Sequence, residues 1–146
     1  MINPTSEQFK RLQYDPFDPS SIRSNQVKTI HEDIFENIWI GYVNKGVDKY
    51  DKDFRTVIRY SSEAKDPKYR ISDNNINHIT SDSKGNIVVS TKYGGVNIIN
   101  SQSTGIKYYN TASNDTSSKL LKIALRDLLF IDTSALLGFT AFECNL

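Results

Sequence analysis

The chain has 146 residues and a net charge of +1, with 38% hydrophobic and 24% charged residues. This length corresponds to about one domain, and the apolar content is that of a globular protein rather than a disordered one. The basic residues are scattered, so the sequence lacks the electrostatic footprint of a protein that binds nucleic acid or an anionic membrane. The single cysteine, Cys144, excludes an intrachain disulfide.

The sequence repeats itself at an offset of 49 residues, because Ile22–Asp66 aligns with Ile71–Asp115 without a gap. The identical pairs are Ile22/Ile71, Asn25/Asn74, Ile30/Ile79, Asp33/Asp82, Asn37/Asn86, Ile38/Ile87, Gly46/Gly95, Val47/Val96, Tyr60/Tyr109 and Asp66/Asp115. They are turn residues and alternating apolar residues, which indicates a small antiparallel sheet rather than a helix pair. Such a period is typical of units that bury their apolar faces only by stacking on one another.

Residues 1–24 are predicted to hold the fourth strand of a preceding unit, Gln8–Leu12, and a connector. Residues 25–73 form the first full repeat. Its four strands are predicted at Val27–Glu32, Ile38–Ile40, Val47–Tyr50 and Thr56–Tyr60. The continuous apolar run Ile38–Ile40 is typical of a strand that is covered on both faces.

Residues 74–123 form the second full repeat, with strands that include Ile87–Val89, Val96–Ile99 and Ile106–Tyr109. Its first turn carries Gly85, where a hairpin loop closed by a bulge requires a positive φ. The first repeat has Glu36 at this position, which predicts either a strained residue or a different turn. Four short antiparallel strands followed by a longer crossover describe a blade of a β-propeller.

Residues 124–146 are predicted to begin a degenerate third repeat. An amphipathic helix over Ser118–Phe130, with Ser117 or Ser118 as N-cap, is the alternative for this part of the sequence. The predicted fold class is therefore all-β, a partial β-propeller with two complete four-stranded antiparallel blades plus incomplete flanking blades. Seven such blades need about 340 residues to close a ring. We therefore expect exposed apolar faces, and poor solubility, self-association or an origin within a longer protein.

The order of short motifs in the repeat resembles that of the two-component regulator propeller family. Asn25-x-Val-x-x-Ile-x-x-Asp33 is followed by Asn37-Ile-Trp-Ile-Gly41 and by Gly46-Val-Asp-x-Tyr-Asp51. The connector Tyr14–Ile22 is similar to the Asp-Pro-x-Asp-Pro-x-Ser-Leu linker of that family. The resemblance covers residues 8 to 115 well and residues 124–146 only faintly.

This resemblance implies a ligand-sensing segment from the periplasmic sensor region of a Bacteroidetes hybrid two-component system, with an oligosaccharide as the ligand and no catalysis by this chain. The parent protein would be a histidine kinase. The sequence contains none of the signalling parts, and Glu36, Val88 and Ser90 depart from the family pattern. These departures predict a truncated or decayed copy, or an excised fragment. The first residues lack a signal-peptide pattern, which predicts a cytoplasmic location if the chain is expressed as written.

Two other functions remain open from the residues themselves. A protein–protein interaction propeller with no small-molecule ligand would use the same fold, although the Gly-His and Trp-Asp landmarks of WD repeats are missing. A propeller enzyme such as a lyase would need a cluster of catalytic His, Glu or metal-binding residues, and none is visible. We predict no catalytic residue, no metal ligand and no cofactor.

A ligand site in a propeller is expected where the loops between second and third strands meet the crossovers, because these loops converge near the axis. The side chains there that offer hydrogen bonds and stacking are Tyr42, Asn44, Lys45, Lys92 and Tyr93. The alternative is that they are solvated loop tips.

Other polar and aromatic residues have structural interpretations. Trp39 lies inside an apolar run, which favours packing between blades over stacking on a sugar. Asn25 and Asn74 precede the first strands, where a bond to the local backbone is the common role of Asn. His31 and His78 occupy different repeat positions, so a zinc site is not predicted. The acidic residues that lack EF-hand spacing, and are expected at a solvated hairpin tip, are Asp48, Asp51 and Asp53.

Overall fold

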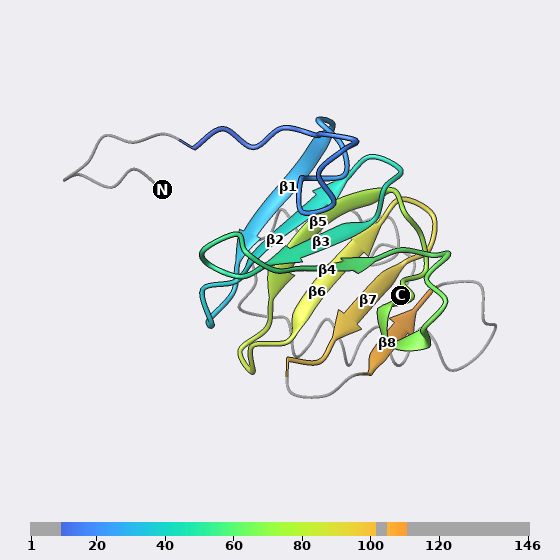
Figure 1. The fold of residues 1–146 in the computed structure, drawn as a ribbon. Coiled ribbons are helices and arrows are strands. Elements are labelled where there is room, and N and C mark those ends of the chain that lie inside the picture. The colour runs from blue at the N-terminus through green and yellow to red at the C-terminus, as the bar shows by residue number, and fades with distance from the viewer. Residues whose placement is uncertain (1–9, 102–104, 111–146) are drawn as a thin grey trace.

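The computed structural model describes residues 10–101 and 105–110, which contain two four-stranded antiparallel sheets. The strands of the first sheet are β1 (Val27–Glu32), β2 (Ile38–Tyr42), β3 (Val47–Tyr50) and β4 (Val57–Tyr60). Those of the second are β5 (Ile76–Ser81), β6 (Ile87–Thr91), β7 (Val96–Ile99) and β8 (Ile106–Tyr109). Within each sheet, strands that follow one another in the chain are neighbours (Figure 1). This is the meander of a propeller blade, and it confirms the predicted all-β fold with two complete blades.

The two sheets share their irregularities as well as their order. In the first sheet the register between β1 and β2 shifts between Val27 and Thr29. In the second sheet the register between β5 and β6 shifts between Ile76 and His78, at the equivalent position. A bulge at the same place in both units shows that the repeat in the sequence is a repeat in backbone geometry.

Glu36 adopts the strained conformation rather than a different turn. Its φ is 64°, and the φ of Gly85 is 80°. In both turns the first aspartate is bonded to the asparagine four residues on: Asp33 N donates to Asn37 O, and Asp82 N donates to Asn86 O, each at 2.9 Å. The shared hydrogen bonds therefore hold a glutamate in the left-handed region that its repeat partner fills with glycine.

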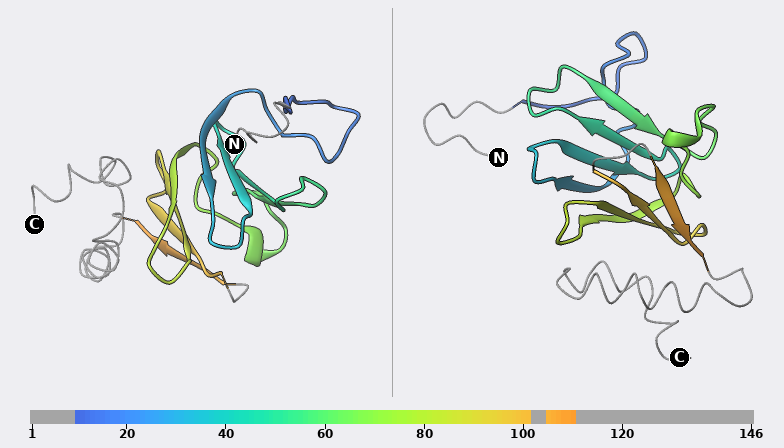
Figure 2. Two further views of the ribbon diagram at one scale, coloured as in Figure 1. Left: turned by 90° about the vertical axis from the view of Figure 1, so that its left-hand side faces the viewer. Right: turned by 90° about the horizontal axis from the view of Figure 1, so that it is seen from below.

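The two sheets lie face to face (Figure 2), and the main core fills the space between them. Trp39 is only 2% exposed and belongs to this core. Its ring stacks on Tyr60 at a centroid distance of 5.5 Å, and its Nε1 donates to Asp33 Oδ2 at 2.8 Å. The predicted role of Trp39 in packing between blades is confirmed. At Gly41 the blades approach so closely that a Cβ would lie 2.7 Å from Ile76 Cγ2.

Three predictions about the rest of the chain have different outcomes. Residues 10–12, the described part of the predicted strand Gln8–Leu12, are not a strand. A fourth strand of a preceding blade needs the third strand of that blade as its hydrogen-bonding neighbour, and the described residues do not include one. Leu12 instead packs against a second core on the far face of the first sheet. The connector between the blades contains a short 3₁₀ helix, η1 (Pro67–Tyr69). Residues 124–146 and the alternative helix over 118–130 lie outside the described residues.

No helix within the described ranges is long and apolar enough to cross a membrane.

Candidate functional site

The two loops that carry the predicted ligand-binding residues are fixed to one short segment of the connector. In the loop between β2 and β3, Gly46 N donates to Asn74 O at 2.9 Å. In the loop between β6 and β7, Lys92 N donates to Asn75 O at 2.8 Å. Tyr93 N donates to Asp73 Oδ2 at 2.9 Å. Residues 43–46 and 92–95 therefore meet at the same end of the two sheets.

Four of the five predicted side chains are exposed at this end. Asn44, Lys45 and Lys92 are exposed, and Tyr93 is 77% exposed. Lys92 Nζ lies 5.1 Å from the centroid of the Tyr93 ring, which is within the range of a cation–π interaction. A cation, hydrogen-bonding groups and an open aromatic face are thus presented together.

Tyr42 does not lie at the loop tip where it was predicted, because its side chain is buried with 0% exposure. It is the last residue of β2, and its hydroxyl donates to Asp48 Oδ2 at 2.9 Å. Burial, followed by the negative charge of Asp48, raises the pKa of Tyr42. The burial of Tyr42 could have been predicted from its spacing of two residues from Ile40, which places both side chains on one face of the strand.

The backbone at Tyr93 is held in place by a dense set of hydrogen bonds. Asp73 Oδ1 accepts from Asn75 N at 3.1 Å while its other oxygen accepts from Tyr93 N. Thr91 Oγ1 accepts from Gly94 N and donates to Gly95 O, both at 3.0 Å. This loop is therefore ordered before any ligand arrives, which reduces the entropic cost of binding.

A buried ionic network in the first blade was missed by sequence reasoning, which placed Asp48 at a solvated hairpin tip. Asp48 has 0% exposure and accepts from Arg23 Nε at 2.6 Å. Arg23 Nη2 also donates to the carbonyls of Val47 at 2.7 Å and Tyr60 at 2.9 Å. The Arg59 guanidinium approaches the second Asp48 oxygen at 3.9 Å. The network ties the incoming connector to β3 and β4.

The second blade has a neutral version of the same link. Ser72 and Asn97 lie 49 residues after Arg23 and Asp48. Ser72 N donates to Asn97 Oδ1, and Asn97 Nδ2 donates to Ser72 Oγ, both at 2.9 Å. Because a neutral pair performs the same task in the sister blade, we interpret the charged network as structural rather than catalytic.

The remaining polar residues also hold the fold together. Asn25 Oδ1 accepts from Tyr14 N at 2.9 Å, and Asn74 Oδ1 accepts from Ser62 N at 2.8 Å. Both asparagines bond to backbone, but the partners lie 11 and 12 residues earlier in the chain and not in the local backbone that was predicted. His31 Nε2 lies 3.1 Å from Ser81 Oγ across the two blades, and burial lowers the His31 pKa. Among the described residues no group of three His, Cys, Asp or Glu side chains is placed to hold a metal ion.

Comparison with known proteins connects this geometry to one class of solved structures. No family model matches the chain, and no curated protein matches it. The extracellular domain of BT3049 from B. thetaiotaomicron, described as a putative hybrid two-component system, is similar with a TM-score of 0.60 and 20% identity. The alignment covers 75% of this chain and 15% of that domain.

The extracellular domain of BT4673 from the same organism is also similar. One structure of it, from a protein described as a hybrid two-component system, has a TM-score of 0.50 and 24% identity over 62% of this chain and 12% of that one. Another, described as a one-component system, has a TM-score of 0.53 and 23% identity over 70% and 14%. This chain thus spans about 15% or less of each matched domain. The likeness shows a shared fold, and the matched proteins are of the class whose repeat the sequence resembles.

Proposed function

We propose that these two blades form part of an extracellular, periplasmic sensor region and present two loops of its ligand-binding face. The observation that carries this proposal is the attachment of both loops to residues 73–75, which brings Asn44, Lys45, Lys92 and Tyr93 to one end of the blades. The fold shared with extracellular domains of two-component systems supports the sensor role.

We propose an oligosaccharide as the ligand, in keeping with the family that the sequence resembles. The Tyr93 ring offers a face for stacking, and Asn44, Lys45 and Lys92 offer the hydrogen bonds that sugar hydroxyls need. A propeller face draws on loops from most of its blades, whereas this chain supplies two such loops. We therefore expect millimolar affinity at best for the chain alone, about 4 kcal/mol.

The test is a titration of the purified chain with a panel of oligosaccharides, followed by NMR. We expect weak, saturable shifts of the amides of residues 43–46 and 92–95, which disappear in Tyr93→Ala. Phe35→Ala is the matched control, because Phe35 is also an exposed aromatic residue but lies in the turn at the opposite end of β2. Shifts that map elsewhere, or that survive in Tyr93→Ala, would contradict the proposal. Micromolar binding lost in Tyr93→Ala would instead make the chain a self-sufficient sensor module.

The free face of the first blade favours a second role, in packing against another blade. Ile76 and Ile79 of β5 are 0% and 1% exposed, and both side chains lie against Gly41 of the first blade. Their repeat partners in β1, Val27 and Ile30, are 39% and 64% exposed. We propose that this side of β1 packs against a further blade of the same repeat type in a longer protein.

Light scattering of the isolated chain tests the second role. We expect the chain to self-associate through the exposed side of β1, because a face that lacks its partner finds another apolar surface. Ile30→Asp should shift the chain toward the monomer. Ile58→Asp is the control, since Ile58 is an exposed isoleucine on β4. A monomeric parent chain with sharp, cooperative unfolding would refute the proposal.

A further inference from the structure

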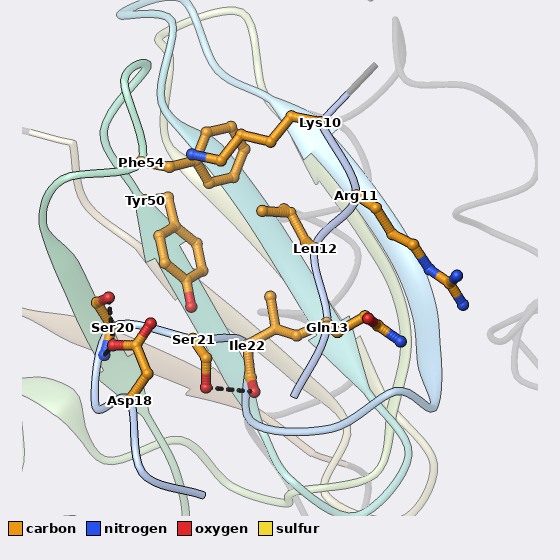
Figure 3. A pocket seen from close by; sticks show the side chains of 10 residues that line it. All are labelled: Lys10, Arg11, Leu12, Gln13, Asp18, Ser20, Ser21, Ile22, Tyr50 and Phe54. Atoms are coloured by element: carbon orange, nitrogen blue, oxygen red, sulfur yellow. Dashed lines mark hydrogen bonds between the residues drawn. The ribbon is translucent and has the colours of Figure 1, made fainter. Parts of the chain in front are cut away.

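The two outer faces of this pair of blades are covered to different extents. On the far face of the first sheet, a pocket of about 200 Å³ remains between residues 10–13 and the β3–β4 hairpin (Figure 3). Leu12, Ile22, Tyr50 and Phe54 are among the residues that line it. The described residues therefore cover this face only in part, in keeping with the further blade that we propose for it.

On the opposite outer face, that of the second blade, two valines are buried without belonging to either core. Val88 and Val96 are 5% and 3% exposed. Val88 lies between Ile87 and Val89, which both belong to the main core, so alternation along β6 directs Val88 away from the first blade. Val96 pairs with Ser90, two residues after Val88, and so shares its face. Neither valine belongs to the main or the second core, and the described part of the chain contains no third sheet to cover them.

The cover over these valines is not a blade that packs as the second blade packs on the first. That contact depends on Gly41, where a Cβ would lie 2.7 Å from Ile76 Cγ2. The second blade has Ser90 at this repeat position. Its side chain is buried, and its Oγ donates to the carbonyl of His78 at 3.3 Å. Ser90 therefore takes up space that the first strand of a following blade would need.

The sequence after the second blade contains apolar residues at the positions that a cover needs. Ile71, Ile76 and Ile79 precede β6 and lie in the main core, where they face the first blade. Their repeat positions 49 residues later hold three leucines, Leu120, Leu125 and Leu128. One repeat later, the same positions are expected to face the outer side of the second blade.

The same part of the sequence lacks turn residues that shape a blade. Aligned without a gap, Ala135 and Cys144 take the positions of Asn86 and Gly95. Gly95 has a φ of 78°, and a Cβ there would lie 2.2 Å from the carbonyl oxygen of Tyr109. A cysteine does not fit this turn. Apolar contact residues that are kept while turn residues are lost indicate a cap rather than another blade.

We propose that residues 120–128 of this chain cap the outer face of the second blade, with Leu120, Leu125 and Leu128 over Val88 and Val96. The cap ends the row of blades on this side, as a terminal repeat ends a solenoid. It leaves the exposed side of β1 as the face that is open to a further blade.

Paramagnetic relaxation in the full chain tests the cap. Arg126→Cys, combined with Cys144→Ser so that the chain has a single cysteine, carries one nitroxide spin label. We expect the label to broaden the amide signals of Val88 and Val96 more strongly than that of Ile40, which lies in the second core on the far side of the first sheet. Equal broadening at all three amides, or none, would overturn the proposal.

A mixed sample separates the chain's own segment from a second copy of the chain. It contains isotope-enriched chain without the spin label and ordinary chain that carries the label. We expect the broadening at Val88 and Val96 to be lost in this mixture, because only the ordinary chain holds a label. Broadening that appears in the mixture would show that another copy supplies the cover, and would contradict the cap.

Urea denaturation followed by Trp39 fluorescence gives a second readout. Leu125→Ala and Leu128→Ala should each lower the midpoint by about 1 M, because each removes buried contacts of a leucine. Arg126→Ala is the matched control within the same segment and should leave the midpoint unchanged. Leucine variants that unfold like the parent chain, or no more easily than Arg126→Ala, would refute the cap. Ile30→Asp concerns the opposite face, so the two proposals fail independently.

Discussion

Removal of the Asp48 carboxylate should be among the most damaging single changes in the first blade. Asp48→Ala leaves the Arg23 guanidinium, 18% exposed, beside a cavity without its carboxylate, and it leaves the Tyr42 hydroxyl without an acceptor. Breaking a buried ion pair by deleting one partner costs about 3–5 kcal/mol, mostly from the charge left behind. Proteins of this size are stable by only about 5–15 kcal/mol, so much of the stability should be lost.

The fluorescence of Trp39, the single tryptophan, reports on the core between the blades during urea denaturation. With a urea dependence of about 2 kcal/mol per molar, a loss of about 4 kcal/mol lowers the midpoint by about 2 M. Asn97→Ala removes the neutral counterpart and should cost less, about 1–3 kcal/mol. Asp53→Ala, at an exposed position, should stay within about 0.5 kcal/mol. If Asp48→Ala costs no more than Asp53→Ala, the buried network does not support the blade as described.

Three further changes are expected to move stability in defined directions in the same urea assay. Glu36→Gly should raise the free energy of unfolding by roughly 0.5–1 kcal/mol, because glycine adopts a φ of 64° without strain. Gly85→Ala should lower the free energy of unfolding, and the reverse order would contradict the strain argument. Gly41→Ala should lower the free energy of unfolding by about 1–3 kcal/mol, because the new methyl carbon would lie 2.7 Å from Ile76 Cγ2. An unchanged midpoint would show that the blades separate easily. Burial holds the pKa of His31 in the folded state below its value in the unfolded state. As the pH drops through about 6.5, the unfolded state therefore takes up the proton first and the free energy of unfolding should fall. His31→Gln should flatten this pH dependence, and an unaltered pH profile would exclude His31 as its source.

The parts of the fold that the sequence predicts well are those that depend on alternation and turn chemistry. The strand bounds Val27–Glu32, Val47–Tyr50, Val96–Ile99 and Ile106–Tyr109 were all predicted as the structure has them. Such elements are local, since period-two patterns and flanking turn residues specify them within a few residues. The expected strand at residues 8–12 failed over its described part because a strand forms only with a neighbour, and that information is not local.

Prediction of the candidate site succeeded for exposed loop tips and failed for side chains that point inward. Asn44, Lys45, Lys92 and Tyr93 lie on the loops that the repeat places them on. Tyr42 was treated as part of a loop, although it ends β2 and faces the core. Asp48 was treated as solvated because an isolated aspartate in a hairpin usually is. Its partner Arg23 lies 25 residues earlier, and only the tertiary structure brings the two together.

The two blades serve as controls for each other, and this comparison separates structure from function. Where both blades have the same residue, as at Gly46 and Gly95, the backbone requires it: each has a positive φ, and a Cβ there would lie 2.2 Å from a carbonyl oxygen. Where the residues differ but the task is the same, as with the charged and neutral links to β3 and β7, the chemistry is interchangeable. Where one blade has a group with no counterpart and no hydrogen-bond partner among the described residues, as with the Tyr50 hydroxyl, packing alone does not explain it. That third class is where a partner has the most to gain, because an unsatisfied buried hydroxyl costs about 1–3 kcal/mol until something bonds to it.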